Sequence, residues 1–258
     1  MSSRTVVHWF RSALAGYAQN RDTPAGQATS RLGQDLRFGL ISIRELHARC
    51  VASGAGPSVE TYLKELAWRE FYIAILHEFP EVFDVEFNPE FRGMPWDGTD
   101  EHFGAWSEGR TGFPIIDAGI RQLLATGFMH NRVRMIVAMF LTKDLHCHWR
   151  AGESLFMRHL VNGENASNNG GWQWSAGTGP DPAPYFRIQN PWTHTRRFDP
   201  NGEYIKTWLP ELQHVPSHLF QAPPKGGGSL APDYPAPIVD HAVERQRTLA
   251  AFARHRRG

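Results

Sequence analysis

Apolar residues recur at helical spacing along much of the chain, and no run alternates between apolar and polar positions with hairpin turns at its ends. Val59, Tyr62, Leu63 and Leu66 share one face of a predicted helix that begins at Ser58 and ends at about residue 79. Further helices are predicted at residues 115–126, 129–148 and 152–160, with shorter ones near 205–208 and 237–254. The pattern predicts an all-α fold with long functional loops.

Several local signals predict where the helices begin and end. Ser42 followed by Glu45 is a capping box at a helix start, and Gly127 is a suitable residue to end the helix before it. Residues 21–35 and 84–114 are rich in turn-forming residues and are predicted to be irregular. The chain after residue 162 is predicted to be mostly loop, with residues 226–228 on the surface.

The composition excludes several classes of protein. The net charge of +1 gives no overall preference for nucleic acid, so a polyanion site would have to be local, built from arginines. The two cysteines, Cys50 and Cys147, are too far apart in sequence for a metal or disulfide motif, so no metal site is expected. The longest apolar run, residues 135–141, is too short to cross a membrane. Reduced thiols and no export signal favour a cytoplasmic protein.

Residues 165–174 combine two tryptophans, adjacent amides and a glycine pair, and their pattern shows no helical or strand period. Glycines allow close approach of a large group, amides supply directed hydrogen bonds, and indoles stack and lose electrons. One interpretation is a loop that meets a planar aromatic cofactor. The other is a polar loop anchored by two tryptophans.

Glu65, Trp68, Arg69 and Tyr72 fall on one helix face. This stripe is either a salt-bridged surface or the wall of a pocket, where Trp68 stacks on a flat ligand, Glu65 binds polar edges and Arg69 pairs with phosphate. Two other segments leave the same choice between a solvated turn and an anion site. Asn131, Arg134 and Met135 share a face, with Arg132 pointing elsewhere, and the hydroxyl-rich loop at residues 29–32 could hold phosphate.

Five motifs occur in one order and together resemble the helical flavin-binding domain of the photolyase/cryptochrome family. They are Trp-Arg-Glu-Phe-Tyr at 68–72, Met-His-Asn-Arg-x-Arg-Met at 129–135, Phe-Leu-x-Lys-Asp-Leu at 140–145, Asn-Asn-Gly-Gly-Trp-Gln-Trp at 168–174 and Ala-Pro-Tyr-Phe-Arg-Ile at 183–188. The resemblance is greatest to the class I cyclobutane pyrimidine dimer photolyases and extends over nearly the whole chain.

The resemblance implies FAD as the cofactor. It places Asn168 at flavin N5 and Arg134 beside the flavin ring, and it assigns the diphosphate to Tyr17, Thr29, Ser30, Arg31 and Leu32. Asn162, Gly163 and Glu164 stand where the family usually has Asp-Gly-Asp beside the flavin. The loss of the first acid leaves Arg134 less compensated, which either favours an anionic reduced flavin or weakens FAD binding.

The resemblance also implies a substrate site and an electron-transfer path. Trp68 and Trp174 would flank a pyrimidine dimer, Glu65 and Asn131 would bind its polar edges, and Met135 would line its pocket. Glu65, Asn131 and Asn168 would be the catalytic residues, and Arg21, Arg132 and Arg187 would meet DNA phosphates. Trp172, Trp149 and Trp96 match the family's electron-transfer tryptophans, from the flavin outward.

The function implied is light-driven repair of cyclobutane pyrimidine dimers in UV-damaged DNA by an electron from excited reduced FAD. The alternatives are a cryptochrome-type blue-light sensor and a helical remnant without cofactor.

Residues 5–11 resemble the first strand of the family's N-terminal antenna domain and run directly into helical-domain sequence. We therefore expect a residual N-terminal segment at residues 1–15, one domain at 16–258, no antenna chromophore, and a bared helical face available for oligomerisation.

Overall fold

The computed structural model describes residue 9, residues 13–180 and residues 186–256, and the described residues form helices and loops with no strand. This confirms the all-α prediction. The α-helices are α2 (Tyr17–Asn20), α3 (Gly33–Arg37), α4 (Ile43–Ala52), α5 (Pro57–Glu78), α6 (Asp100–Ser107), α7 (Pro114–Thr126), α8 (Asn131–Lys143), α9 (Trp149–His159), α10 (Asn165–Ala176), α11 (Pro191–Phe198), α12 (Glu203–Trp208) and α13 (His241–His255). The 3-10 turns are η1 (Leu14–Gly16), η2 (Pro80–Phe83), η3 (Pro89–Phe91), η4 (Pro210–Leu212), η5 (Ser217–Gln221) and η6 (Lys225–Gly227).

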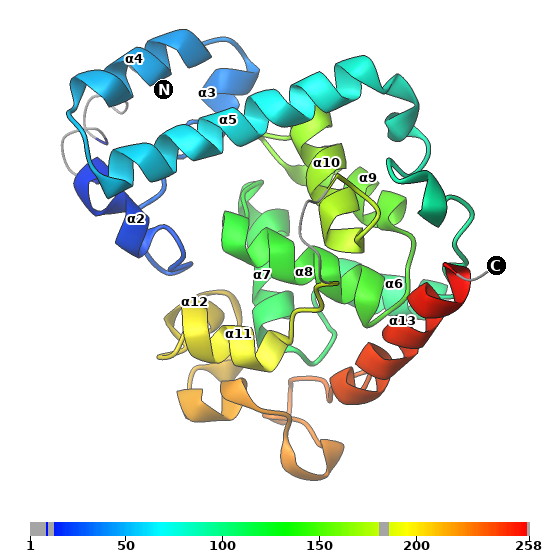
Figure 1. Ribbon diagram of the computed structural model, residues 1–258. Helices are drawn as coiled ribbons and strands as arrows, with labels where there is room; N and C mark the ends of the chain where they lie inside the picture. Colours follow the sequence, from blue (N-terminus) through cyan, green and yellow to red (C-terminus); the bar gives the residue numbers. More distant parts are fainter. Residues whose placement is uncertain (1–8, 10–12, 181–185, 257–258) are drawn as a thin grey trace.

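The main core surrounds α7 and α8, which pack against each other near the centre of the molecule (Figure 1). Almost every residue of α8 after its first turn is buried, because α7, α9, α10, α11 and α13 all pack on it. Helix α10 contacts α5, α8 and α9 at once. A helix surrounded in this way can present side chains to a cavity while the rest of its surface is held by packing.

A second apolar cluster joins the N-terminal part of the chain to the first half of α5. Trp9, Tyr17 and Tyr62 form its aromatic centre, with ring centroids 4.6–5.9 Å apart. The indole N–H of Trp9 donates to the carbonyl of Ala28 at 3.1 Å, which ties this cluster to the loop before α3. Residues 1–8 and 10–12 of the expected N-terminal segment lie outside the described residues.

Several predicted helix limits hold where a cap or a proline sets them, whereas the start predicted near residue 237 is wrong, because α13 begins at His241 after the Asp240 cap. The hydroxyl of Ser42 accepts the backbone N–H of Glu45 at the start of α4, and Gly127 ends α7 in the left-handed region with φ of 67°. Helix α5 covers Pro57–Glu78, within a residue of the prediction at each end.

Two predicted limits are wrong around His146. Helix α8 ends at Lys143 instead of residue 148, because His146 takes a φ of 53° that interrupts the helical backbone. Helix α9 then starts at Trp149 instead of residue 152, because the His148 side chain caps it by accepting the backbone N–H of Arg150.

Two segments predicted as loops contain helices. The 84–114 region includes α6, which Thr99 caps by accepting the backbone N–H of His102. Residues 165–174 lie within α10, and α11 follows in the region after 162. A side-chain cap and burial against α5, α8 and α9 hold the glycine- and asparagine-rich α10 helical, although both residue types disfavour helices.

The structure also describes the features that were considered from composition. Cys50 and Cys147 are both free and buried. Among the described residues no helix is long and apolar enough to span a bilayer, and no group of metal-ligating side chains gathers. The 226–228 glycines lie exposed, as predicted.

Candidate functional site

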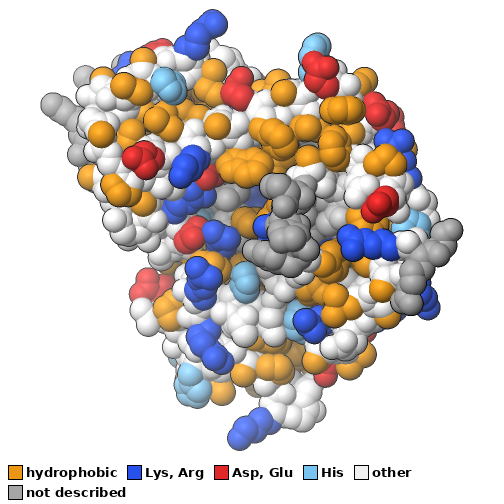
Figure 2. Space-filling view, viewed as in Figure 1, with side chains coloured by type: hydrophobic (Ala, Val, Ile, Leu, Met, Phe, Trp, Pro, Cys, Tyr) orange, Lys and Arg blue, Asp and Glu red, His pale blue; other side chains and the backbone are white. Residues whose placement is uncertain are grey.

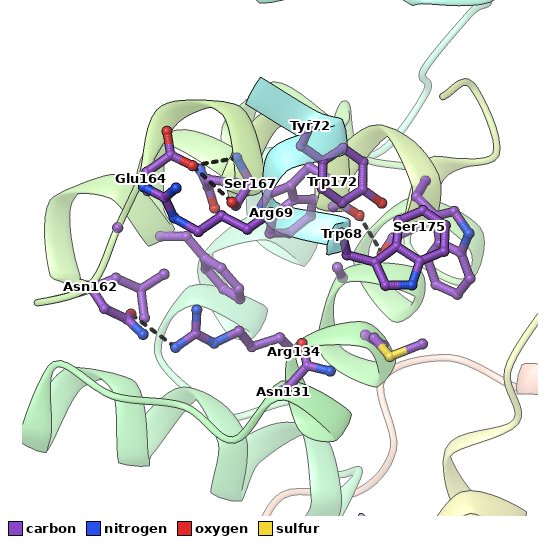
Figure 3. Close-up of a pocket in the computed structure, with 18 of the residues that line it drawn as sticks. Trp68, Arg69, Tyr72, Asn131, Arg134, Asn162, Glu164, Ser167, Trp172 and Ser175 are labelled. Atoms are coloured by element: carbon purple, nitrogen blue, oxygen red, sulfur yellow. Dashed lines mark hydrogen bonds between the residues drawn. The ribbon is translucent and has the colours of Figure 1, made fainter. Parts of the chain in front are cut away.

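A cavity of about 630 Å³ opens between α5, α8, α9 and α10 (Figure 3). Its size lies within the range of sites that hold cofactors and drug-sized ligands. The lining combines aromatic rings with amides and guanidinium groups, and it comprises Arg21, Glu65, Trp68, Arg69, Tyr72, Asn131, Arg132, Arg134, Met135, Ala138, Phe156, Leu160, Asn162, Gly163, Glu164, Ser167, Asn168, Gly171, Trp172, Trp174, Ser175 and Arg187.

The four residues of the α5 stripe all line this cavity, as the pocket-wall interpretation requires. Trp68 and Tyr72 lie one turn apart with their rings stacked at 5.9 Å and 29°. Trp68 is 44% exposed, which leaves an indole face open for a planar group. Glu65 accepts a hydrogen bond from Arg21 at 2.5 Å, so the end of α2, which packs on α5, holds this carboxylate in place.

Asn131, Arg134 and Met135 reach the cavity from the first turns of α8, as their shared face predicts. The expectation that Arg132 points elsewhere is wrong, because Arg132 lines the same cavity. Asp22 and Phe198 are among the residues that contact it. Its Nη2 lies 2.8 and 2.9 Å from the carboxylate oxygens of Asp22, and its guanidinium lies 4.8 Å from the centre of the Phe198 ring.

Arg134 is a partly buried charge of the cavity. It donates to the carbonyl of Met129 at 2.7 Å and to Oδ1 of Asn162 at 3.1 Å (Figure 3). Burial lowers the pKa of Arg134 to about 10, and no carboxylate in the described part of the chain pairs with it. A partly buried guanidinium without a carboxylate partner is costly unless an anion balances it, so this end of the cavity favours an anionic ligand.

The residues after Asn162 start α10 and turn its side chains toward the cavity. The Glu164 carboxylate accepts the backbone N–H groups of Ala166 and Ser167 and the hydroxyl of Ser167. Glu164 therefore acts as a helix cap as well as part of the lining. One turn later, Asn168 donates to the carbonyl of Glu153 at 3.1 Å, which fixes its amide beside α9.

The two glycines of the pair at 170 and 171 have different surroundings. A Cβ on Gly170 would lie 2.0 Å from Cδ1 of Tyr72, so this glycine lets α10 pack directly against α5. Gly171 has open space around it and lines the cavity. Farther along α10, Trp174 lines the cavity with Arg187, whose guanidinium lies 5.1 Å from the indole centre.

The five residues expected to hold a diphosphate do not line the cavity. Tyr17 and Leu32 are buried in the second core cluster, and Ser30 accepts the hydroxyl of Tyr62 at 2.9 Å. Thr29 lies on the same loop, and Arg31 packs over the Phe128 ring at 4.6 Å with φ of 52°. The loop continues into Gly33, which packs against Asn162 and so places the segment next to the cavity.

Of the three candidate electron-transfer tryptophans, only Trp172 lines the cavity. Its ring edge packs on Gly152, one helical turn from Trp149 in α9. The His148 ring lies 5.6 Å from Trp149 and 5.5 Å from Trp96, measured between ring centres. The three indoles therefore follow one another from the cavity outward through packed side chains.

Sequence reasoning missed six lining residues: Ala138, Phe156, Leu160, Ser167, Gly171 and Ser175. A helical period was the available signal. Ser167, Gly171 and Ser175 recur every fourth residue, as do Phe156 and Leu160. Because residues 165–174 were predicted to have no helical period, the shared face of Ser167, Gly171 and Ser175 was not recognised.

Figure 2 shows Lys and Arg side chains gathered in a row beside a hollow, from the region of α5 to that of α11. Arg21, Arg69, Arg132 and Arg187 of the lining contribute basic groups around the cavity. A local row of positive charge on a nearly neutral protein is the arrangement that a polyanion site requires. Of the motif at 183–188, residues 183–185 lie outside the described residues.

Comparison with known proteins gives a consistent answer. Residues 62–254 match the model of the family described as the FAD binding domain of DNA photolyase. A deoxyribodipyrimidine photo-lyase from Alkalihalophilus pseudofirmus is 46% identical over 251 residues, which are 94% of this chain and 52% of the relative. The chain thus spans about half the length of the curated relatives it matches.

Solved structures share the fold. A bacterial class III photolyase from Agrobacterium tumefaciens superposes with a TM-score of 0.92 at 40% identity, over 99% of this chain and 55% of that one. A cryptochrome from Synechocystis superposes with a TM-score of 0.88 at 29% identity, over 96% of this chain and 54% of that one. With its helical fold and its cavity in the matched region, the chain belongs to the family of the FAD binding domain of DNA photolyase.

Proposed function

We propose that this protein binds FAD in the cavity between α5, α8, α9 and α10 and uses light to repair cyclobutane pyrimidine dimers in DNA. The observation that supports this most is the joint presence in one cavity of Glu65, Trp68, Asn131 and Trp174 together with the partly buried Arg134. When bound, reduced FAD supplies the light-excited electron donor, and the protein positions the reacting groups.

The lining fits an anionic dinucleotide with a flat ring. In this proposal Arg134 supplies the balancing positive charge, and Asn162 keeps its hydrogen bond without adding a carboxylate. Asn168 donates to the carbonyl of Glu153, and from there its amide would face flavin N5. Tyr17, Thr29, Ser30, Arg31 and Leu32 would take the diphosphate beside the cavity lining, where their loop continues into Gly33 against Asn162. Gly163 and Glu164 would contact the cofactor from the lining itself.

The damaged bases would enter from the α5 side. Photolyases and other enzymes that act on a base take it out of the stack, and aromatic faces offset the lost stacking by about 1–3 kcal/mol for each base. Trp68 and Trp174 would flank the dimer and Met135 would pack against it. Glu65, already oriented by Arg21, and Asn131 would hydrogen-bond its polar edges. A carboxylate held in place can accept hydrogen bonds from base N–H groups without rearranging.

Phosphates of the strand would meet the basic row around the mouth. Arg132, Arg187, Arg69 and Arg21 carry this part of the proposal. Arg132 exchanges its bond to Asp22 for a phosphate oxygen when DNA binds. The activity is proposed for the cytoplasm, with one FAD and no antenna chromophore held by this chain.

The repair assay is the direct test. Purified protein with chemically reduced FAD is illuminated with an oligonucleotide that contains one thymine dimer, and intact thymines are measured by chromatography. We expect repair that needs light and FAD. Glu65→Ala should lower repair by roughly 10- to 1000-fold without loss of flavin colour, whereas Glu60→Ala, an exposed change on the same helix, should not. No repair by protein with bound reduced FAD would reject the proposal.

A light-sensing role is the second candidate, because the Synechocystis cryptochrome shares the fold. It requires the flavin and the tryptophans but not the Glu65–Trp68 wall. A light-induced change of shape together with weak binding to dimer-containing DNA would favour it over repair.

A further inference from the structure

The indole N–H of Trp149 donates to Oε1 of Glu86 at 3.1 Å, and both side chains are buried. The neighbouring indoles differ in this respect. The N–H groups of Trp172 and Trp96 are buried without a partner in the described part of the structure, and the N–H of Trp106 donates to the Val137 carbonyl at 3.2 Å. A carboxylate therefore meets only one of these four indoles.

Trp172 touches two different routes away from the cavity. On one side its ring meets Trp106, with ring centroids 6.0 Å apart at 76°. On the other side it packs on Gly152, where a Cβ would lie 2.1 Å from Cη2 of Trp172, and Trp149 is one turn away on the same helix. On packing alone, an electron vacancy on Trp172 could therefore move to either of two indoles, Trp106 or Trp149.

The hydrogen-bond acceptors separate the two routes. An indole that has lost an electron is a cation whose N–H is far more acidic than that of the neutral ring. A buried carboxylate stabilises that cation by charge and can take its proton, whereas the Val137 carbonyl offers a dipole and cannot hold the proton. Hydrogen bonds to an ionised partner are about twice as strong as neutral ones, and low local dielectric increases the difference.

We propose that Glu86 directs oxidation from Trp172 to Trp149 instead of Trp106 and accepts the Nε1 proton of Trp149. This inference rests on the proposed function, because the oxidant is a photoexcited oxidised flavin. Trp172 loses one electron to that flavin, and one electron then moves from Trp149 to Trp172. The Nε1 proton of Trp149 passes to Oε1 of Glu86, leaving a neutral indolyl radical and a neutral carboxylic acid.

The chain around Glu86 is held independently of Trp149. The Arg92 guanidinium donates to the backbone carbonyl of Glu86 at 3.0 Å, and the next residue, Phe87, donates its backbone N–H to the Gln173 side chain at 2.7 Å. A change at the Glu86 carboxylate should therefore leave the loop in place. Glu86 acts directly on Trp149 and is not among the residues that line the cavity.

Glu86→Gln removes the charge and keeps the shape, and Glu90→Gln, an exposed acid four residues on, is the matched control. Transient absorption after a laser flash on protein with oxidised FAD separates protonated from deprotonated tryptophan radicals. We expect the yield of long-lived deprotonated radical to fall on the order of tenfold in Glu86→Gln, to stay unchanged in Glu90→Gln and to recover partly in Glu86→Asp. Equal yields in Glu86→Gln and the unaltered protein would overturn the proposal.

Trp106→Phe tests the choice of route. In the unaltered background it should not change the radical yield, whereas in the Glu86→Gln background it should remove most of the remaining radical. A loss in the unaltered background as large as that of Trp149→Phe would show that Trp106 already carries the vacancy and would overturn the proposal.

A flavin-free measurement keeps the inference separate from the proposed function. Pulsed ultraviolet photoionisation makes indole radical cations in protein without FAD. The fraction of indole radical cations that lose their proton quickly should disappear in both Trp149→Phe and Glu86→Gln. If this fraction persisted in Glu86→Gln, the role of Glu86 would be contradicted independently of the flavin. Photoreduction that survives Trp172→Phe would instead contradict the proposed electron-transfer path.

Discussion

Two adjacent glycines in α10 have opposite surroundings. Gly170 sits against the Tyr72 ring, and Gly171 has nothing within 4 Å of where a Cβ would be. Gly170→Ala should destabilise the protein by about 1–3 kcal/mol, because the new methyl group overlaps the ring. Gly171→Ala should raise stability by up to about 1 kcal/mol, because alanine favours the helix.

Urea unfolding of the two alanine variants beside the unaltered protein measures both changes. Equal destabilisation by the two substitutions would contradict the close packing of α10 on α5. The pair is informative because both changes add the same atoms one residue apart.

Trp172 is the residue where the cavity meets the tryptophan path, since its ring lines the cavity and its edge packs on Gly152. Trp172→Phe removes an oxidisable ring but keeps an aromatic one. Under continuous light with an external reductant, we expect flavin photoreduction to be abolished. Repair by chemically pre-reduced protein should fall far less, because that reaction does not draw on the tryptophans. Equal loss of both would contradict this division of roles.

Helix α8 begins at a buried histidine. The His130 side chain caps it by accepting the backbone N–H of Arg132, and burial, with the nearby Arg134 and Arg132 charges, lowers the pKa of His130 to about 4. The unfolded chain holds the His130 proton up to a pKa near 6.5. Between these values the unfolded state binds more protons, so stability is lost as the pH falls from about 6.5 to 4.

His130→Asn keeps a cap acceptor and removes the titration. We expect the variant to lose less stability than the unaltered protein over this pH range, by on the order of 3 kcal/mol. His214→Asn, in an exposed turn, is the control. Urea midpoints at several pH values give the comparison, and parallel curves for His130→Asn and the unaltered protein would refute it.

At the scale of the whole molecule, the basic row beside the cavity makes DNA binding depend on salt although the net charge is only +1. Arg132→Gln should weaken binding to dimer-containing DNA and reduce the slope of affinity against salt by about one. Asp22→Asn should act in the opposite direction, because it frees Arg132 from its carboxylate partner.

Fluorescence titrations at four or more salt concentrations provide the slopes. Arg110→Gln changes an exposed arginine that is paired with Glu108, away from the cavity lining, and should leave the slope unaltered. If Arg132→Gln and Arg110→Gln gave the same slope, Arg132 would not be a phosphate contact.

The printed sequence was sufficient for the parts of this molecule that depend on neighbours along the chain. The stripe from Glu65 to Tyr72 and the shared face of Asn131, Arg134 and Met135 follow from helical periodicity, and all these residues line the cavity. The caps at Ser42 and Gly127 also depend on local geometry alone. Five motifs in one order identified the family, because each motif is a short run of neighbouring residues and their order along the chain is read directly from the sequence.

Only the tertiary structure decided what depends on residues far apart in sequence. Residues 165–174 have poor helix formers, yet Glu164 caps them and α5, α8 and α9 bury them as α10. Arg132 turns toward the cavity because Asp22, 110 residues away, holds it there, and the Trp149 indole meets Glu86 from a loop 63 residues earlier. Local propensity amounts to less than about 1 kcal/mol for each residue, so packing and buried hydrogen bonds override it. These partners cannot be deduced from spacing, because the folded backbone alone brings them together.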